Sequence, residues 1–424
     1  PLLLAGTAGS GKTTIAVYYL LRKEFLEKRR IFLTYSPFLK RFSEQIYDGL
    51  IKNADHGKLK ATRPDFYVFR DLLADILKAH GSRYDKEKEV GLGEFERIFR
   101  NHGLHRKYDA VLVWEEIRSI IKGAKSPVYL NRYKKLVGQC GAGEVSRNEM
   151  QELKEYLLSL KNLEVIQKIE KLVVNKSGYA SYDDFLLEVD TGNAVSRSRT
   201  LPVLHEILRI IEKKTPSLSD PLLTFQEYMA LGKKRAPNFL YDRREIYSIA
   251  EYYQEKLEAE GLWDEIDLCK RALQLLRGTE DRFIYDLVVC DEVQDFSDIQ
   301  IALIFRLSRS GHNVFLTGDP KQIINPSGFR WEEVKNKFYD RGMPVPDLLK
   351  LNLNFRCVGS IVKLANALLD LKQKLVGLSD TEMREDWKFN GRPPFLLHGM
   401  NEQEVLNGIR LAGAGRIVLV RNRP

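Results

Sequence analysis

The residues near the start of the chain have the types and spacing of a phosphate-binding loop. An apolar run, Leu2–Ala5, leads into a glycine-rich turn with the spacing G-x-x-x-x-G-K-T, and an apolar, helix-forming stretch follows. The turn consists of Gly6, Thr7, Ala8, Gly9, Ser10, Gly11, Lys12, Thr13 and Thr14. Glycines let successive backbone N–H groups face phosphate oxygens, with the positive end of the helix dipole behind them. The pattern predicts a nucleotide site in which Lys12 reaches the outer phosphates and the Thr13 hydroxyl ligates Mg²⁺.

A pair of carboxylates follows a second apolar run far along the chain. Leu287–Cys290 has the composition of a buried strand, and Asp291 and Glu292 come directly after it. Such a strand delivers its acids to the edge of a parallel sheet at which a phosphate loop also lies. We expect Asp291 to bind Mg²⁺ through water and Glu292 to polarise the water that attacks the nucleotide. Alone this is a weak signal, and its value comes from the loop upstream.

Strands and helices alternate around these two motifs. After the first helix, Ile31–Tyr35 is predicted as a buried strand, residues 38–50 as a helix, and residues 65–73 as a third strand that runs into a helix. A further strand, Asn313–Thr317, leads to Gly318–Gln322. Towards the end of the chain, residues 380–394 are predicted as a linker rich in charge and turns, and Ile417–Val420 as a last strand. Repeated strand–helix–strand units of this kind predict an α/β fold with a parallel sheet.

From about residue 76 to residue 280 the pattern changes to long helix-period stretches, such as Glu149–Leu160 and Glu245–Leu275. We expect a mainly helical insertion of about 200 residues within the α/β domain. Two clusters in it, Lys122–Lys135 and Lys233–Arg244, interleave cations with aromatic rings, which suits a single-stranded nucleic-acid track. Solvated helix faces whose rings turn into the core are the alternative for each cluster.

Length and composition bound the class of protein. A chain of 424 residues suggests about two to four domains, and its net charge of +9 favours nucleic acid or acidic membranes as partners. The four cysteines are far apart, which argues against a zinc site or a disulfide framework. The sequence has no run of about 18 apolar residues, so no membrane-spanning segment is predicted. We expect an intracellular protein of the nucleus or cytoplasm, neither secreted nor bound to a membrane. The chain opens inside a strand, so we also expect a fragment of a larger protein.

At this point the motifs resemble those of the superfamily 1 helicases of the UvrD/Rep/PcrA type. The phosphate loop is similar to their first motif, and Asp291–Asp295 matches their D-E-x-Q-D motif. Gly318–Gln322 is similar to their G-D-x-x-Q motif, and Leu351–Arg356 resembles their L-x-x-N-Y-R motif. Within the insertion, Trp114–Ile117 looks closer to the UvrD-like domain of large proteins with ankyrin and tetratricopeptide repeats.

The resemblance implies roles for residues at matching positions. Gln322 would sense the γ-phosphate, Phe355 would stack on adenine, and Arg356 would contact the γ-phosphate. For Phe355, a simple packing role in the core is the alternative. The pair Phe329 and Arg330 looks like a Trp-Arg pair whose ring stacks on a base of the single strand.

The same resemblance implies a nucleic-acid contact and a division into domains. Thr34 and Ser36 stand where the family's second conserved strand end contacts the DNA backbone. Residues 1–75 and 281–350 would form a discontinuous first RecA-like ATPase domain. Residues 76–280 would form the helical insertion, a possible nucleic-acid-binding subdomain, and residues 351–424 the start of a second, truncated RecA-like domain.

The implied activity is a 3′-to-5′ DNA helicase or translocase that hydrolyses ATP with Mg²⁺ to move along single-stranded DNA. We expect this fragment to bind nucleotide and Mg²⁺ but to hydrolyse ATP slowly. A regulatory ATP switch acting on a protein partner is an alternative, and so is an enzyme directed to RNA. The D-E-x-Q-D motif favours the DNA-directed branch.

Overall fold

The computed structural model describes most residues of the chain. These are residues 1–53, 62–82, 84–124, 129–143, 146–159, 163–191, 194–214, 222–223, 225–230, 241–276, 281–319, 329–339, 343–376, 384–392, 394 and 401–411. The chain divides into two compact units, Pro1–Leu351 and Asn352–Pro424. No helix in the described ranges is long and apolar enough to cross a membrane.

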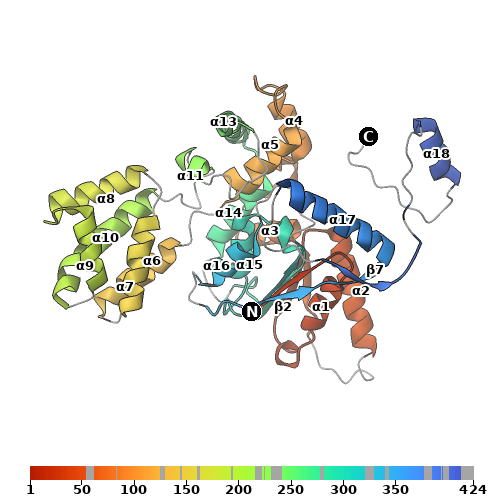
Figure 1. Cartoon of the computed structure of the whole chain (residues 1–424), viewed down its shortest axis with the longest axis horizontal. Coiled ribbons are helices and arrows are strands. Elements are labelled where there is room, and N and C mark those ends of the chain that lie inside the picture. The colour runs from red at the N-terminus through yellow and green to blue at the C-terminus, as the bar shows by residue number, and fades with distance from the viewer. Residues whose placement is uncertain are drawn as a thin grey trace. The chain divides into compact units, whose positions relative to one another are not determined.

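A parallel sheet organises the first unit (Figure 1). Within the described residues it has six strands, in the order β3, β2, β4, β5, β1, β6. Their bounds are β1 (Leu2–Gly6), β2 (Arg30–Thr34), β3 (Asp65–Val68), β4 (Leu287–Cys290), β5 (Val314–Gly318) and β6 (Leu348–Leu351). Leu33 pairs with Cys290, and Ala5 pairs with Gly318. This register brings the carboxyl ends of the central strands to one edge, although β1 and β4 lie far apart in the sequence.

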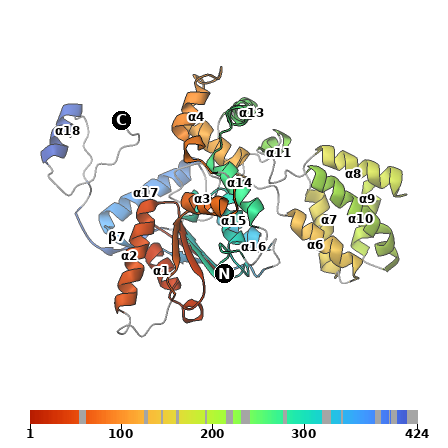
Figure 2. The ribbon, with the colours of Figure 1, turned by 180° about the vertical axis from the view of Figure 1, so that it is seen from behind.

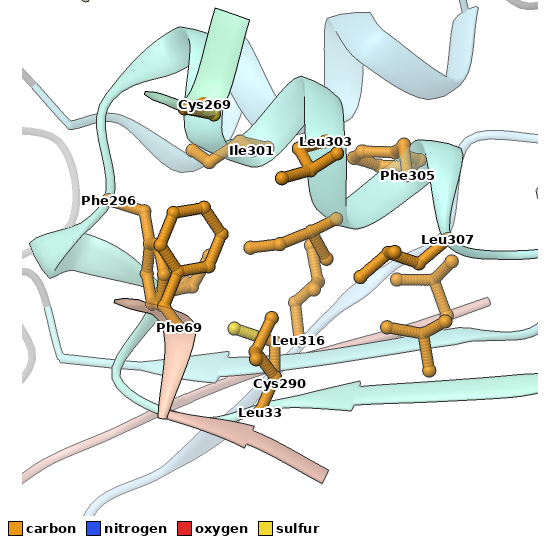
Figure 3. Packing of buried hydrophobic residues seen from close by; sticks show 14 of the residues in the cluster. Leu33, Phe69, Cys269, Cys290, Phe296, Ile301, Leu303, Phe305, Leu307 and Leu316 are labelled. Carbon is orange, nitrogen blue, oxygen red and sulfur yellow. The ribbon is translucent and has the colours of Figure 1, made fainter. Parts of the chain in front are cut away.

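Helices cover both faces of the sheet, which explains why its central strands are apolar runs. One face packs against α3 (Phe69–Ala79), α14 (Glu265–Leu275), α15 (Asp298–Arg306) and α16 (Trp331–Tyr339). The other packs against α1 (Lys12–Tyr19) and α2 (Pro37–Asn53). Figure 3 shows Leu33, Cys290 and Leu316 of the strands facing Ile301 and Leu303 of α15. This three-layer arrangement confirms the predicted α/β, RecA-like class.

The described part of the predicted insertion is mainly helical and contains two separate cores. One core joins α4 (Leu92–Phe99), α5 (Ala110–Glu116), the π-helix η4 (Ile117–Ile121), α11 (Phe225–Ala230) and α13 (Arg243–Glu260). The other belongs to a five-helix bundle, visible in both Figure 1 and Figure 2. The bundle helices are α6 (Tyr129–Gly141), α7 (Arg147–Ser159), α8 (Leu163–Lys176), α9 (Tyr182–Thr191) and α10 (Ala194–Lys214). Short helical turns also occur at η1 (Lys23–Phe25), η3 (Lys86–Lys88) and η5 (Val293–Asp295).

The stretch predicted to run helically from Glu245 to Leu275 is two helices. Gly261 adopts φ 64° and ends α13, a backbone region that favours glycine. Asp264 then caps α14, because its side chain accepts hydrogen bonds from the N–H groups of Ile266 and Asp267. Together these two residues turn the chain between the helices.

The second unit consists of a parallel strand pair, β7 (Leu353–Val358) and β8 (Asp386–Phe389), with helices α17 (Gly359–Val376) and α18 (Glu402–Leu411). Its strand β8 lies inside residues 380–394, which we predicted as a linker, so that prediction is wrong. A side chain at Gly359 would overlap the ring of Trp387, and glycine therefore allows α17 to pack against β8. The strand predicted at Ile417–Val420 lies outside the described residues.

Candidate nucleotide-binding and catalytic site

The loop between β1 and α1 has a backbone that glycine makes possible. Gly9 and Gly11 adopt φ values of 74° and 88°, where other L-residues are strained. A Cβ at Gly6 would lie 2.6 Å from Ser10 Oγ and 2.8 Å from Lys12 Cγ. The glycines therefore allow a tight loop that ends at the first turn of α1, where unpaired backbone N–H groups attract anions.

The side chain of Lys12, the first residue of α1, points into this loop and not into solvent. Its side chain is buried, and Nζ donates to the carbonyl oxygens of Gly6 at 2.8 Å and Thr7 at 3.1 Å. The hydroxyls of Thr7 and Ser10 are also buried, and neither has a hydrogen-bond partner within the described part of the chain. Buried polar atoms normally have partners, so two free hydroxyls beside an ammonium fit phosphate oxygens as their acceptors.

Thr13 connects the loop to the distant carboxylates. Its Oγ1 donates to Asp291 Oδ2 at 2.6 Å, and the Asp291 N–H donates to the carbonyl of Leu33 at 2.9 Å. Asp291 is fully buried, and burial together with the neighbouring charge of Glu292 raises its pKa to about 7. A cation would relieve this penalty, and a hydroxyl with a carboxylate is the oxygen donor set that Mg²⁺ prefers. The residues present fit the metal that the sequence predicted.

Glu292 occupies a strained turn between β4 and η5. With φ 55° it is, among the described residues, the only one besides glycine with a positive φ. Its N–H donates to Asp291 Oδ1 at 3.0 Å. Backbone strain of this kind costs on the order of 1–3 kcal/mol and gathers at functional sites. The turn therefore directs a partly exposed carboxylate away from the buried strand.

Gln294 holds this carboxylate in place, a role that our sequence analysis missed. Its Nε2 donates to Glu292 Oε2 at 2.8 Å, while its Oε1 accepts from the Asp319 N–H at 3.0 Å. A side chain at Gly318 would collide with this amide, at 2.5 Å from Oε1. Gln294 thus joins the turn after β4 to the end of β5. The available signal was a glutamine two positions after the carboxylate pair.

A buried ionic network lies beside the site. Arg118 of the π-helix η4 donates to the Tyr35 hydroxyl and approaches Glu265 of α14 at 3.4 Å. Glu265 also accepts from the Tyr35 hydroxyl and from the Gln300 amide. The insertion is therefore tied to the end of β2 and to α15 by charged hydrogen bonds, which are stronger than neutral ones.

The remaining predicted nucleotide residues either belong to the second unit or are not among the described residues. Gln322 is outside the described residues. Phe355 and Arg356 belong to the second unit, on β7, where both are exposed. The exposure of Phe355 contradicts the alternative that its ring only packs in a core. Asn354 shapes this strand, because its Oδ1 accepts from the N–H groups of Arg356 at 2.9 Å and Cys357 at 2.7 Å.

Two predicted nucleic-acid contacts have local structural roles. Thr34 is fully buried, and its Oγ1 accepts a hydrogen bond from the Ser36 N–H at 3.4 Å. Ser36 is half-buried, and its Oγ accepts from the Leu39 N–H at 3.3 Å in the first turn of α2. The burial of Thr34 removes its side chain from the surface, so its predicted contact with a DNA backbone is corrected.

The base-stacking prediction for Phe329 also needs correction. Its ring is buried in the main core and packs edge-on against Trp331, with 5.2 Å between ring centroids. A ring enclosed in this way has no free face for a base. Arg330, by contrast, is exposed.

The basic and aromatic clusters of the insertion are only partly described. Tyr133 is buried in the bundle core, where its hydroxyl donates to the Leu204 carbonyl at 3.1 Å. The ring of Tyr241 packs against that of Tyr108 at 4.7 Å. For Tyr133 and Tyr241 the structure therefore supports the alternative, in which the rings pack against other parts of the protein. Residues 233–240 of the second cluster lie outside the described residues.

Comparisons with known proteins identify a family and several relatives to which this chain is similar. The model of the UvrD/REP helicase N-terminal domain family matches residues 1–340. Human TPR and ankyrin repeat-containing protein 1 is 29% identical over 272 residues, which cover 58% of this chain and 9% of that protein. One component of an ATP-dependent helicase/nuclease from Lactococcus lactis is 29% identical over 230 residues, which cover 48% of this chain and 19% of that component.

DNA helicase II of Escherichia coli is 33% identical over 126 residues, 28% of the chain and 17% of that protein. The chain thus spans less than one fifth of the length of each of these relatives. The family match confirms the predicted resemblance to helicases of the UvrD type. The chain belongs to the UvrD/REP helicase family, whose N-terminal domain extends over residues 1–340.

Proposed function

We propose that this chain is the ATPase core of a superfamily 1 helicase or translocase that moves 3′ to 5′ along single-stranded DNA. The observation that carries the proposal is the hydrogen bond of 2.6 Å between Thr13 and Asp291, which are separated by most of the chain. It brings a phosphate-type loop and a carboxylate pair to one sheet edge. The family match and the basic net charge of +9 support nucleic acid as the second ligand.

In the proposed reaction, ATP lies in the loop with its outer phosphates near Lys12. Bound Mg²⁺, held by Thr13 and Asp291, would neutralise phosphate charge. Glu292 orients the attacking water and accepts its proton, while Gln294 keeps the carboxylate aimed at the phosphate. Lys12 exchanges its two carbonyl acceptors for phosphate oxygens, so that charge developing on the nucleotide meets an ammonium already in place.

The coupling of hydrolysis to movement is part of the same proposal. Gln322 would report the γ-phosphate to the nucleic-acid side, Phe355 would stack on adenine, and Arg356 would contact the γ-phosphate. We propose the domain division as well, with residues 1–75 and 281–350 as the first RecA-like domain. Residues 351–424 would open the second.

The test is the ATPase rate of the chain with and without single-stranded DNA. We expect stimulation by an oligothymidylate that falls steeply between about 50 and 200 mM salt, because binding releases counterions. Single-stranded RNA and duplex DNA of matched length are the comparisons, and stronger stimulation by RNA would reassign the substrate. If no nucleic acid changes the rate at any salt concentration, the translocase proposal is refuted.

A regulatory switch acting on a protein partner is the second candidate. It is favoured by the five-helix bundle with its own core and by the similarity to a human protein named for its repeats. Stacked repeats form extended protein-binding surfaces. The switch would be supported over the translocase if the chain binds a protein in a nucleotide-dependent way and single-stranded DNA does not change its ATPase rate.

A further inference from the structure

The first turns of α2 expose a pair of aromatic rings. Phe38 is 74% exposed and Phe42 is 44% exposed, although phenylalanine is among the residues most often buried. Their rings lie 6.3 Å apart with only 4° between their planes. Arg41 and Gln45 are exposed as well, and helical spacing places them beside these rings on one face.

This face is not the one that packs into the protein. The core side of α2 carries Ser43 and Tyr47, which are buried, and Ile46 and Leu50, which pack against the cluster beneath the sheet. Helix α2 therefore packs against the protein through residues other than Phe38 and Phe42. Exposed apolar groups that gather on a second face mark a site of interaction.

The position of the rings relates them to the nucleotide site. The first turn of α2 follows β2, and β2 is hydrogen-bonded to β4, the strand that ends at Asp291. All strands of this sheet are parallel, so α2 begins at the same edge as the phosphate loop. Neighbouring strands are roughly 5 Å apart, which puts the start of α2 close to the carboxylate turn.

The start of α2 is also held firmly. The Tyr35 hydroxyl bonds to Glu265, and the Ser36 hydroxyl accepts from the Leu39 N–H at the first turn. The charge there is positive, since Lys40 and Arg41 precede the first acidic residue of the helix, Glu44. The positive end of the helix dipole adds to this.

We propose that Phe38 and Phe42 form a stacking platform for bases of single-stranded nucleic acid, with Arg41 beside them as a phosphate contact. The inference rests on the proposed function and assigns the stacking surface to α2, after Phe329 proved to be buried. Parallel, exposed rings bind any base through its π-face, and a neighbouring cation holds the backbone. A protein partner or a second copy of the chain would also cover apolar rings, but neither would require a π-face.

The test separates stacking from general apolar contact with two double variants of the chain. Phe38→Leu with Phe42→Leu keeps apolar side chains but removes the rings, whereas Phe38→Tyr with Phe42→Tyr keeps them. Binding is measured by the anisotropy of a labelled oligothymidylate. We expect the leucine pair to bind about tenfold more weakly or worse, and the tyrosine pair to bind like the parent, since stacking depends on the ring.

A matched control replaces exposed apolar residues elsewhere, Leu158→Ala with Leu187→Ala in the bundle, where both side chains are about as exposed as Phe38 and Phe42. This variant should bind the oligonucleotide like the parent. Equal binding by the parent and the leucine pair would overturn the platform while leaving the proposed function intact. Failure of the parent itself to bind any oligonucleotide would refute the proposed function, and the platform with it.

Discussion

The sequence predicted the position of Glu292, but neither its backbone conformation nor its hydrogen bond with Gln294. Its place after an apolar strand predicted a carboxylate at the sheet edge, and the structure has it there. Its left-handed backbone, φ 55° and ψ 47°, has no sequence signature, because glutamate is a poor residue for that region. The hydrogen bond from Gln294 to Glu292 could not be predicted either, because it joins side chains across a turn whose shape does not follow from the motif.

Replacement of Glu292 by glutamine tests its role as the group that accepts the proton. Glu292→Gln keeps the shape of the side chain but removes the base, so ATP turnover should fall by at least about a hundredfold. Nucleotide affinity should change little, because the loop still supplies its phosphate contacts. Phosphate release at saturating ATP and titration with a fluorescent nucleotide give the two quantities.

Lys12→Ala is the contrasting variant, because it removes the ammonium from the loop. It should abolish nucleotide binding in the same titration. A Glu292→Gln chain that hydrolyses ATP at the parent rate would mean that another group orients the water. If the Lys12→Ala chain binds nucleotide normally, the loop between β1 and α1 is not the nucleotide-binding site.

At the scale of elements, the π-helix η4 and α14 are joined by a charge cluster that no pattern foretold. Lys122 is fully buried just after η4, and its Nζ lies 2.7 Å from both Asp264 Oδ2 and Asp267 Oδ2. Lys122 belongs to a cluster that was predicted either as a nucleic-acid track or as a solvated helix face whose rings turn into the core. Helical periodicity predicts which residues face inwards on one helix, but not which distant carboxylates meet them, so this buried triad had to come from the structure.

Lys270, three residues after Asp267 on α14, makes the stability of this region depend on pH. Burial, and then the charge of Lys122, lower the pKa of Lys270 from 10.5 to about 8. Between these two pH values the unfolded chain holds a proton that the folded chain lacks. The free energy of unfolding attributable to Lys270 should therefore rise with pH across this window.

Lys270→Met removes the titrating group and should flatten this rise. From pH 7.5 to pH 9.5, the stability of the parent relative to Lys270→Met should increase by on the order of 2 kcal/mol, as chemical denaturation measures it. Lys78→Met on α3, where the lysine is exposed, is the control. A constant difference between the parent and Lys270→Met across the range would contradict the prediction.

At the scale of the whole molecule, the sequence predicted what local motifs determine. The loop, the strand before Asp291 and the α/β class follow from residues adjacent in the chain. Phe329 was misplaced because its burial depends on contact with Trp331 and on the packing of α16. Strand β8 was missed because Asp386–Phe389 is short, charged and exposed, and so lacks the apolar pattern of a strand.

The separation of cores within the insertion leads to a prediction about the whole chain. The bundle core, as far as the structure describes it, contains residues from Tyr133 to Ile211 and shares none with the sheet cores. The chain on either side of the bundle comes back together, because the Leu223 N–H donates to the Ile121 carbonyl at 2.8 Å. A short flexible linker can therefore replace residues 125–221 without stretching the remaining structure.

We expect the shortened chain to fold and to bind nucleotide within about threefold of the parent, since no described residue of the loop or the carboxylate turn belongs to the bundle core. Titration with a fluorescent nucleotide and thermal unfolding measure this. Stimulation by single-stranded DNA, measured on the same chain, then shows whether the bundle belongs to the nucleic-acid track. Retained stimulation would assign the track to the sheet edge near α2, whereas lost stimulation with intact nucleotide binding would assign part of it to the bundle. Loss of nucleotide binding itself would contradict the independence of the two cores.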